Sequence, residues 1–233
     1  MMGILLLLLF LLSWPAEGGA QIVVDRFSKT DAQGLPAGWT LEGDRGESSK
    51  ISVEQADSRT FLRLVSIRNS FGLKKELRFD IRRYPYLSWF WKADQLPKGG
   101  DIRKRETDDQ AGQLYVLFPR FPARINTRSV GYIWDTLAPA GLAGTSTAYG
   151  KMKYFVLQSG PASLGRWMAE TRNVYRDYKT LFREEPPEVG GVLLYINTQH
   201  TGSQADFSYD DLVFSASPPK EGEGGRGVGR RVP

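Results

Sequence analysis

The side chains that could do acid–base chemistry in this 233-residue chain are mainly carboxylates. The chain has no cysteine and a single histidine, His200, which lies in a polar segment with no serine-elbow motif nearby. A cysteine nucleophile and a zinc site built on cysteine and histidine are therefore excluded, and a Ser-His-Asp triad would have to use His200. What remains is carboxylate chemistry, proton transfer by tyrosine or arginine, calcium binding, or no chemistry.

Glu170 together with Asp108 or Asp109 would be the acid and base if the protein cleaved glycans. Retaining glycosidases need two carboxyl groups about 5–5.5 Å apart, and inverting enzymes need about 6.5–9.5 Å. Asp108 and Asp109 point in opposite directions on an extended chain, so at most one of them faces a given cleft. Glu170 and Arg172 share a face if their segment is a strand, either as a structural ion pair at the sheet edge or over the helix, or as a polar site on a concave sheet face. In an enzyme, Arg172, Tyr175 or Tyr132 would aid substrate binding. No catalytic residue is assigned on these grounds alone.

Tryptophan side chains are the second set of candidate functional groups. Sugars stack their C–H faces on indole rings, while polar side chains at the rim meet their hydroxyl groups. We assign three of the five tryptophans after residue 20 to the core and one or two to a surface cleft, with Trp91 or Trp134 as the exposed pair. The predicted ligand-binding residues are Trp91, Trp134, Asp109, Glu170, Arg172 and Tyr175.

Short strands are the elements that must position these groups. Residues 86–92 alternate, with Leu87, Trp89 and Trp91 on one face and Tyr86, Ser88 and Phe90 on the other, so both faces carry large aromatics. Similar segments recur between glycine, proline and aspartate turns. They are residues 22–27, 51–53, 61–67, 71–79, 113–118, 129–134, 153–158, 167–172, 192–196 and 207–214. This pattern predicts an all-β fold, a two-sheet β-sandwich or jelly roll.

One stretch, residues 173–183, has the period of a helix instead. Val174, Tyr178, Leu181 and Phe182 fall at offsets 0, 4, 7 and 8, which places them on one helical face. The pair of prolines at 186–187 would end such a helix. We therefore expect one short helix near residues 173–183.

The two ends of the chain differ in composition from the middle. Residues 4–12 form an unbroken apolar run followed by small residues, which predicts a signal peptide over residues 1–20, or alternatively an uncleaved anchor. Residues 21–215 then form a single domain, and the Gly- and Pro-rich residues 216–233 a disordered tail. We expect a periplasmic or secreted protein.

The formal charge of +5 comes from scattered basic residues mixed with acidic ones, which argues against nucleic-acid binding. The oligomeric state stays open.

Several landmark motifs follow in a fixed order along the chain. They are GLPAGW at 34–39, YLSWFWKADQLPKGGD at 86–101, TDDQAGQLYVLF at 107–118, YIWD at 132–135, YFVLQSG at 154–160, GRWMAETRNVYRDYKTLF at 165–182 and EEPPEVGGVLLYINTQHTGSQADFSYDDLVF at 184–214. In this order they resemble the bacterial domain-of-unknown-function family 3047. The resemblance implies an exported jelly roll of the concanavalin-like or galactose-binding-like type and supplies no activity. In residues 197–202, amides stand where the family usually has carboxylates, so a cation bound there in relatives would bind more weakly here.

Calcium is the one cofactor that remains a candidate. Asp210 and Asp211 open the predicted last strand. In many carbohydrate-binding jelly rolls, one aspartate of such a pair holds a structural calcium ion against the first strand, where Asp25 lies here. By this analogy the metal site would use Asp25 and Asp210.

Non-catalytic binding of a carbohydrate or cell-envelope glycan is our leading hypothesis for the function. It is based on strand faces that combine aromatic and polar side chains, and on the lack of nucleophile and metal-ligand sets. One alternative is a glycoside hydrolase or polysaccharide lyase of the sandwich type. Another is a structural or interaction module of the envelope, which uses a sheet face for protein contacts.

Overall fold

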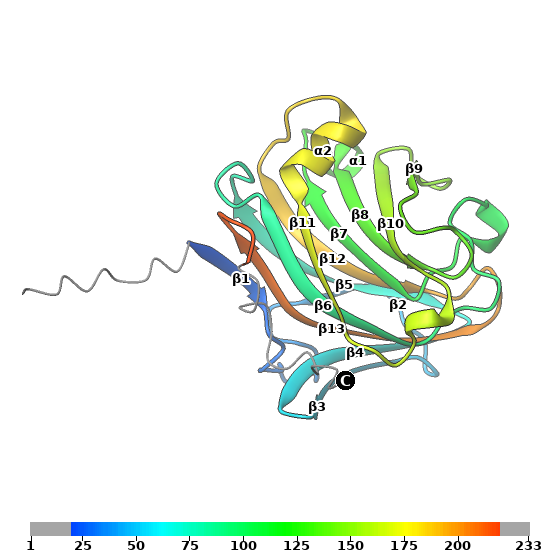
Figure 1. Ribbon diagram of the computed structural model, residues 1–233. Helices are drawn as coiled ribbons and strands as arrows, with labels where there is room; N and C mark the ends of the chain where they lie inside the picture. Colours follow the sequence, from blue (N-terminus) through cyan, green and yellow to red (C-terminus); the bar gives the residue numbers. More distant parts are fainter. Residues whose placement is uncertain (1–19, 220–233) are drawn as a thin grey trace, which may run out of the picture.

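The computed structural model describes residues 20–219 (Figure 1). The predicted signal peptide, residues 1–20, lies outside the described residues except for Ala20, and so does most of the predicted disordered tail, residues 216–233. Within the described part, no helix is long and apolar enough to cross a membrane.

Two sheets form a sandwich, which confirms the predicted all-β fold. The six-stranded sheet has the order β11-β6-β13-β4-β3, and β1 pairs with β13 beside this path. The seven-stranded sheet has the order β2-β5-β12-β7-β8-β10-β9. The first sheet contains β1 (Gln21–Asp25), β3 (Lys50–Ala56), β4 (Arg59–Ile67), β6 (Tyr86–Gln95), β11 (Met168–Asn173) and β13 (Gln204–Ser215). The second contains β2 (Thr40–Asp44), β5 (Ser70–Phe79), β7 (Gly112–Phe118), β8 (Arg128–Asp135), β9 (Ala143–Thr145), β10 (Met152–Ser159) and β12 (Val189–Asn197).

Two strands of the seven-stranded sheet were not predicted. All side chains of β2 are exposed, so it shows no apolar alternation, and β9 has only three residues. Both are edge strands of this sheet. Strand β10 pairs with β8 in parallel, whereas β9 pairs with β10 antiparallel. Two parallel neighbouring strands can be joined only by a long connection, because the chain must return to the end where the first strand began. The connection between β8 and β10 is of this kind and includes β9.

The core confirms the alternation seen in β6. Leu87, Trp89 and Trp91 are buried between the sheets. Phe90 points to the other face of β6 and is buried there beneath Arg59, whose guanidinium carbon lies 4.5 Å from the centre of the ring. Both faces of this strand are therefore covered, one by the core and the other by side chains of the same sheet.

Helix α2 (Val174–Phe182) confirms the predicted helix and lies at one end of the sandwich, directly after β11 (Figure 1). The side chain of Asn173 caps it by accepting a hydrogen bond from the backbone N–H of Arg176 at 2.9 Å. Val174 and Tyr178 are buried against the main core. Three shorter elements lie outside the sheets: α1 (Ala123–Asn126), η1 (Arg105–Thr107) and η2 (Pro161–Ser163).

Candidate binding groove

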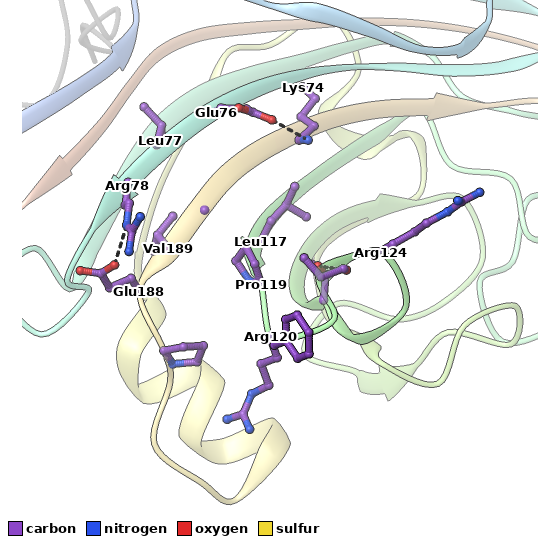
Figure 2. A pocket seen from close by; sticks show the side chains of 15 residues that line it. Lys74, Glu76, Leu77, Arg78, Leu117, Pro119, Arg120, Arg124, Glu188 and Val189 are labelled. Atoms are coloured by element: carbon purple, nitrogen blue, oxygen red, sulfur yellow. Dashed lines mark hydrogen bonds and ion pairs between the residues drawn. The ribbon is translucent and has the colours of Figure 1, made fainter.

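An open groove of about 1240 Å³ lies on the outer face of the seven-stranded sheet (Figure 2). Its walls come from β5, the end of β7, the start of β12 and the segment of residues 119–127 that contains α1. A side chain at position 190 would collide with Pro119, so glycine at this position lets the 119–127 segment lie close against β12. The lining residues are Lys74, Glu76, Leu77, Arg78, Leu117, Pro119, Arg120, Phe121, Ala123, Arg124, Thr127, Pro187, Glu188, Val189 and Gly190.

The strand register shows why these side chains face outward. In β5, Leu73 is buried in the main core, so the adjacent Lys74 points to the opposite face. Lys74 lies opposite Leu193 of β12, which in turn lies opposite Tyr115 of β7. Leu193 and Tyr115 belong to a second apolar cluster that also contains Ile133. The groove is therefore continuous with a sheet face that is distinct from the inside of the sandwich.

The apolar part of the groove includes a highly exposed ring. The side chain of Phe121 is 95% exposed, although phenylalanine is usually buried. Ile125 of α1, in the same segment, is 64% exposed. Leu117 and Pro119 add apolar surface to the floor of the groove. An exposed ring at the rim of a hollow is a surface on which the flat face of another molecule can stack.

The charged side chains of the groove are only partly paired with one another. Lys74 bonds to Glu76 at 3.1 Å, and Arg78 bonds to Glu188 at 2.9 Å, as Figure 2 shows. Arg124 has neither a hydrogen bond nor an ion pair with any described residue.

Arg120 bonds to Glu184, which lies outside the groove and also accepts an ion pair from Arg128. One carboxylate is therefore shared by two guanidinium groups. The basic side chains outnumber the acidic ones at the end of the groove that residues 119–127 form.

Trp91 and Trp134 are both fully buried, so the prediction that they form an exposed pair is wrong. Their rings contact each other inside the core, with centroids 5.8 Å apart. Each indole N–H has an internal acceptor: Trp91 donates to Glu170 at 3.1 Å, and Trp134 donates to the carbonyl of Gly160 at 3.3 Å. Because the polar atom of each ring is satisfied inside the protein, the whole ring can be buried.

Glu170 lies at the margin of the sandwich and not in the groove. It accepts hydrogen bonds from Trp91 of the six-stranded sheet and, at 2.7 Å, from Gln158 of the seven-stranded sheet. Burial raises the pKa of this carboxyl group. Glu170 thus joins β11 to β10 across the open side between the two sheets, and it also lines a smaller pocket of about 200 Å³.

Arg172 does not pair with Glu170, although the two side chains share a face of β11. It makes two hydrogen bonds to Asp177 of α2, at 2.9 and 2.7 Å, and the hydroxyl of Tyr132 donates to the same carboxylate at 2.8 Å. These contacts fix α2 to both sheets. Tyr175 donates instead to the exposed Glu185, at 3.0 Å to the nearer oxygen.

Asp108 and Asp109 have different hydrogen-bond partners. Asp109 is fully buried and accepts bonds from the backbone N–H groups of His200 and Thr201, at 3.2 and 2.6 Å. It also accepts bonds from the His200 ring and the Thr201 hydroxyl. Asp108 is half-buried and accepts from Thr147 at 3.2 Å, and burial raises its pKa.

The three carboxylates suggested for acid–base chemistry make their hydrogen bonds in different parts of the fold. Glu170 contacts residues between the sheets, whereas Asp108 contacts Thr147 in the loop before β10 and Asp109 holds the loop between β12 and β13. None of the three lines the groove.

The two aspartates of the suggested calcium site are occupied by other partners. Asp25 accepts from Lys75 at 2.7 Å, from the indole of Trp39 at 2.8 Å and from a backbone N–H. Asp210 accepts from Arg59 at 2.7 Å. Calcium would have to displace cationic side chains, and within residues 20–219 no group of three or more acidic, histidine or cysteine residues is arranged to hold a metal ion.

A family match settles the relationship that the motifs indicated. The family described as "Protein of unknown function (DUF3047)" matches residues 37–213. The chain belongs to the DUF3047 family. No curated protein matches its sequence.

Solved structures with similar folds include several carbohydrate-binding modules. The family 11 module of the cellulosomal cellulase Lic26A-Cel5E of Clostridium thermocellum shares 8% identity at a TM-score of 0.45, covering 85% of this chain and 96% of its own. The same type of module in complex with a β-1,3-1,4-mixed-linked tetrasaccharide shares 9% identity at a TM-score of 0.44, covering 84% and 95%. The CBM22-1 xylan-binding domain of Paenibacillus barcinonensis Xyn10C shares 12% identity at a TM-score of 0.41, covering 86% and 97%.

The groove of this DUF3047 domain was not found from the sequence. Its walls come from three segments that are far apart in the chain, and only the pairing of β12 with both β5 and β7 brings them together. A weak signal was present in the sequence: Phe121 stands between prolines and arginines in PRFPAR, without the alternation of a strand. Because the neighbours of Phe121 show no apolar alternation, its segment has no buried face that would place the ring in the core.

Proposed function

We propose that this DUF3047 domain binds a carbohydrate, such as a cell-envelope glycan, in the groove and does not cleave it. The observation that carries the proposal is an open hollow of about 1240 Å³ on a sheet face that combines an exposed ring with charged side chains. A sugar has apolar C–H faces for the ring and hydroxyl groups for the charged side chains. Because the groove is open, it suits a segment of a polymer better than a small ligand that must be enclosed.

The carboxylates of the groove support binding without cleavage. Glu76 and Glu188 have side chains that are 82% and 53% exposed, and each forms an ion pair with a basic neighbour. A general acid needs an environment that keeps its proton, usually burial away from compensating charges. Both glutamates are instead exposed and paired with a basic neighbour.

Phe121 provides the test of this proposal. The full chain is titrated calorimetrically with a panel of soluble envelope and plant polysaccharides, and Phe121→Ala is compared with Leu137→Ala. Leu137 is 55% exposed and lies outside the groove lining, so its variant is a matched control for loss of exposed apolar surface. We expect Phe121→Ala to weaken binding about fivefold, as for the loss of one stacking contact, and Leu137→Ala to have no effect. No binding to any polysaccharide, or equal affinities for both variants, would overturn the proposal.

An interaction module of the envelope remains the second candidate, because Phe121 and Ile125 expose apolar surface in one segment. Protein contacts use such exposed apolar patches. Capture of a protein partner that depends on Phe121, together with no polysaccharide binding, would favour this candidate.

We also propose that the protein is exported to the periplasm or the cell exterior, on the basis of the apolar run at residues 4–12. Cell fractionation followed by N-terminal sequencing tests this. We expect a mature N-terminus at Gln21, and full-length protein in the cytoplasm would contradict the proposal.

A further inference from the structure

We infer that the glycan bound in the groove is an acidic polysaccharide, a polymer that carries negative charges at intervals along its length. This inference rests on the proposed function and adds the chemical class of the ligand. It is argued from the charges of the groove, their partners and the directions of their side chains.

The lining of the groove contains a surplus of positive charge. Four lining residues are basic and two are acidic. Lys74 is paired with Glu76 and Arg78 with Glu188, so the charges along β5 and the start of β12 are balanced within each pair. The surplus therefore lies in the 119–127 segment, on Arg120 and Arg124.

Neither arginine of this segment is fully neutralised by the protein. Arg120 shares the single carboxylate of Glu184 with Arg128, and the same guanidinium also donates to the Tyr178 hydroxyl and the Glu185 carbonyl, each at 3.4 Å. Arg124 forms no ion pair with any described residue. The exposed guanidinium of Arg124 has unused donors, which suits it to carboxylate or sulfate groups that it can bind through two parallel hydrogen bonds.

The directions of the two side chains indicate a polymer and not a single small anion. In Figure 2, Arg120 and Arg124 leave the same segment in opposite directions, and Arg120 extends toward α2 and the residues that follow it. They cannot both grip one small ion. Charges that are spaced along a chain lying in the groove could meet each arginine separately.

The acidic side chains of the groove argue for a glycan over a nucleic acid. Each strand of a DNA duplex carries a phosphate about every 3.4 Å along the helix axis, so a bound duplex would place phosphates close to Glu76 and Glu188. A polysaccharide with at most one charge per sugar can place uncharged hydroxyl groups against these carboxylates.

The test compares acidic with neutral polymers on the full chain. Affinity electrophoresis and calorimetry use polygalacturonate and alginate as acidic probes, and dextran and mixed-linkage β-glucan as neutral probes. We expect at least tenfold tighter binding of an acidic probe. Its affinity should fall at least fivefold between low and high salt, because exposed charge interactions are screened.

Arg124→Ala is the variant that tests the charge directly, and Lys50→Ala is its control. Lys50 is an exposed basic residue of β3, on the other sheet. Removing one exposed charge contact should weaken binding of the acidic probe about fivefold in Arg124→Ala and leave Lys50→Ala unchanged.

Equal affinity for neutral and acidic probes, or an effect of Lys50→Ala as large as that of Arg124→Ala, would overturn the inference while the proposed function stands. Binding of single-stranded DNA or of anionic lipid vesicles without binding of any polysaccharide would overturn both. No binding of any probe would also overturn both.

Discussion

Asp109 allows a structural role to be separated from a role in ligand binding. Its buried carboxylate accepts four hydrogen bonds, all from His200 and Thr201. A hydrogen bond to a charged group stabilises a protein by about 1.5–3 kcal/mol, but water can enter this half-buried loop and such contributions are not additive. We therefore expect Asp109→Ala to lower the free energy of unfolding by about 3 kcal/mol, or the Tm by roughly 6–12 °C for a domain of this size.

The neighbouring Asp108→Ala is the matched control. Burial raises the pKa of Asp108, so its charged form gains little from the fold, and its removal should change the free energy of unfolding by less than about 1 kcal/mol. Urea denaturation at pH 7 measures both variants, and polysaccharide titration well below the Tm measures their binding. Asp109 does not line the groove, so its variant should bind normally while folded. A stable Asp109→Ala variant that has lost binding would refute this reasoning and restore the ligand-binding role predicted from the sequence.

Three further predictions concern buried polar groups. Burial and the nearby Asp211 raise the pKa of Asp210 to about 6, so the folded state holds an extra proton between about pH 4 and pH 6 and stability falls as the pH rises through this range. The free energy of unfolding of Asp210→Asn, relative to that of the wild type, should therefore rise by about 2 kcal/mol between pH 4 and pH 7, as measured by urea denaturation. A difference between the two proteins that does not change with pH would contradict the raised pKa of Asp210. Excess EDTA should leave the Tm unchanged, because Lys75 already neutralises Asp25. A rise in Tm on adding calcium would instead support the calcium site suggested at Asp25 and Asp210. Trp91→Phe should lower the free energy of unfolding by about 1–3 kcal/mol, because Glu170 loses a hydrogen-bond donor, and should leave polysaccharide affinity unchanged. A variant with normal stability that has lost binding would show that the ring of Trp91 contacts the ligand.

The sequence predicted the strands and the helix best where the pattern is local. The period of two in residues 86–92 and the helical offsets in residues 174–182 each report which side chains share a face, and the structure confirms both. Strand β2 was not predicted because all its side chains are exposed, so its sequence shows no apolar alternation. Periodicity identifies an element through the contrast between its faces and fails where both faces meet water.

The assignment of Trp91 to a surface cleft failed for a different reason. Alternation already placed it on the same face as Leu87 and Trp89, and that face is the core. The hypothesis of sugar stacking called for an exposed indole ring, but the carboxylate of Glu170 satisfies the N–H of Trp91 inside the protein and lets the whole ring be buried. Sequence spacing does not reveal such a partner, because Glu170 comes from a strand that lies far along the chain and pairs with β6 only in the folded sheet.

The groove is the basis on which we propose glycan binding after both predicted tryptophans proved to be buried. The original reasoning needed an aromatic surface beside charged groups in a hollow, and it looked for that surface on strands. The structure provides it on a segment between strands, where Phe121 is exposed beside Arg120 and Arg124. A rigid sheet with an open outer face can carry such a segment at its edge, and exposed loops on rigid scaffolds are frequent binding sites. Because Arg120, Arg124 and the exposed ring belong to one short segment, changes within residues 119–127 should alter ligand affinity while leaving the two-sheet core intact.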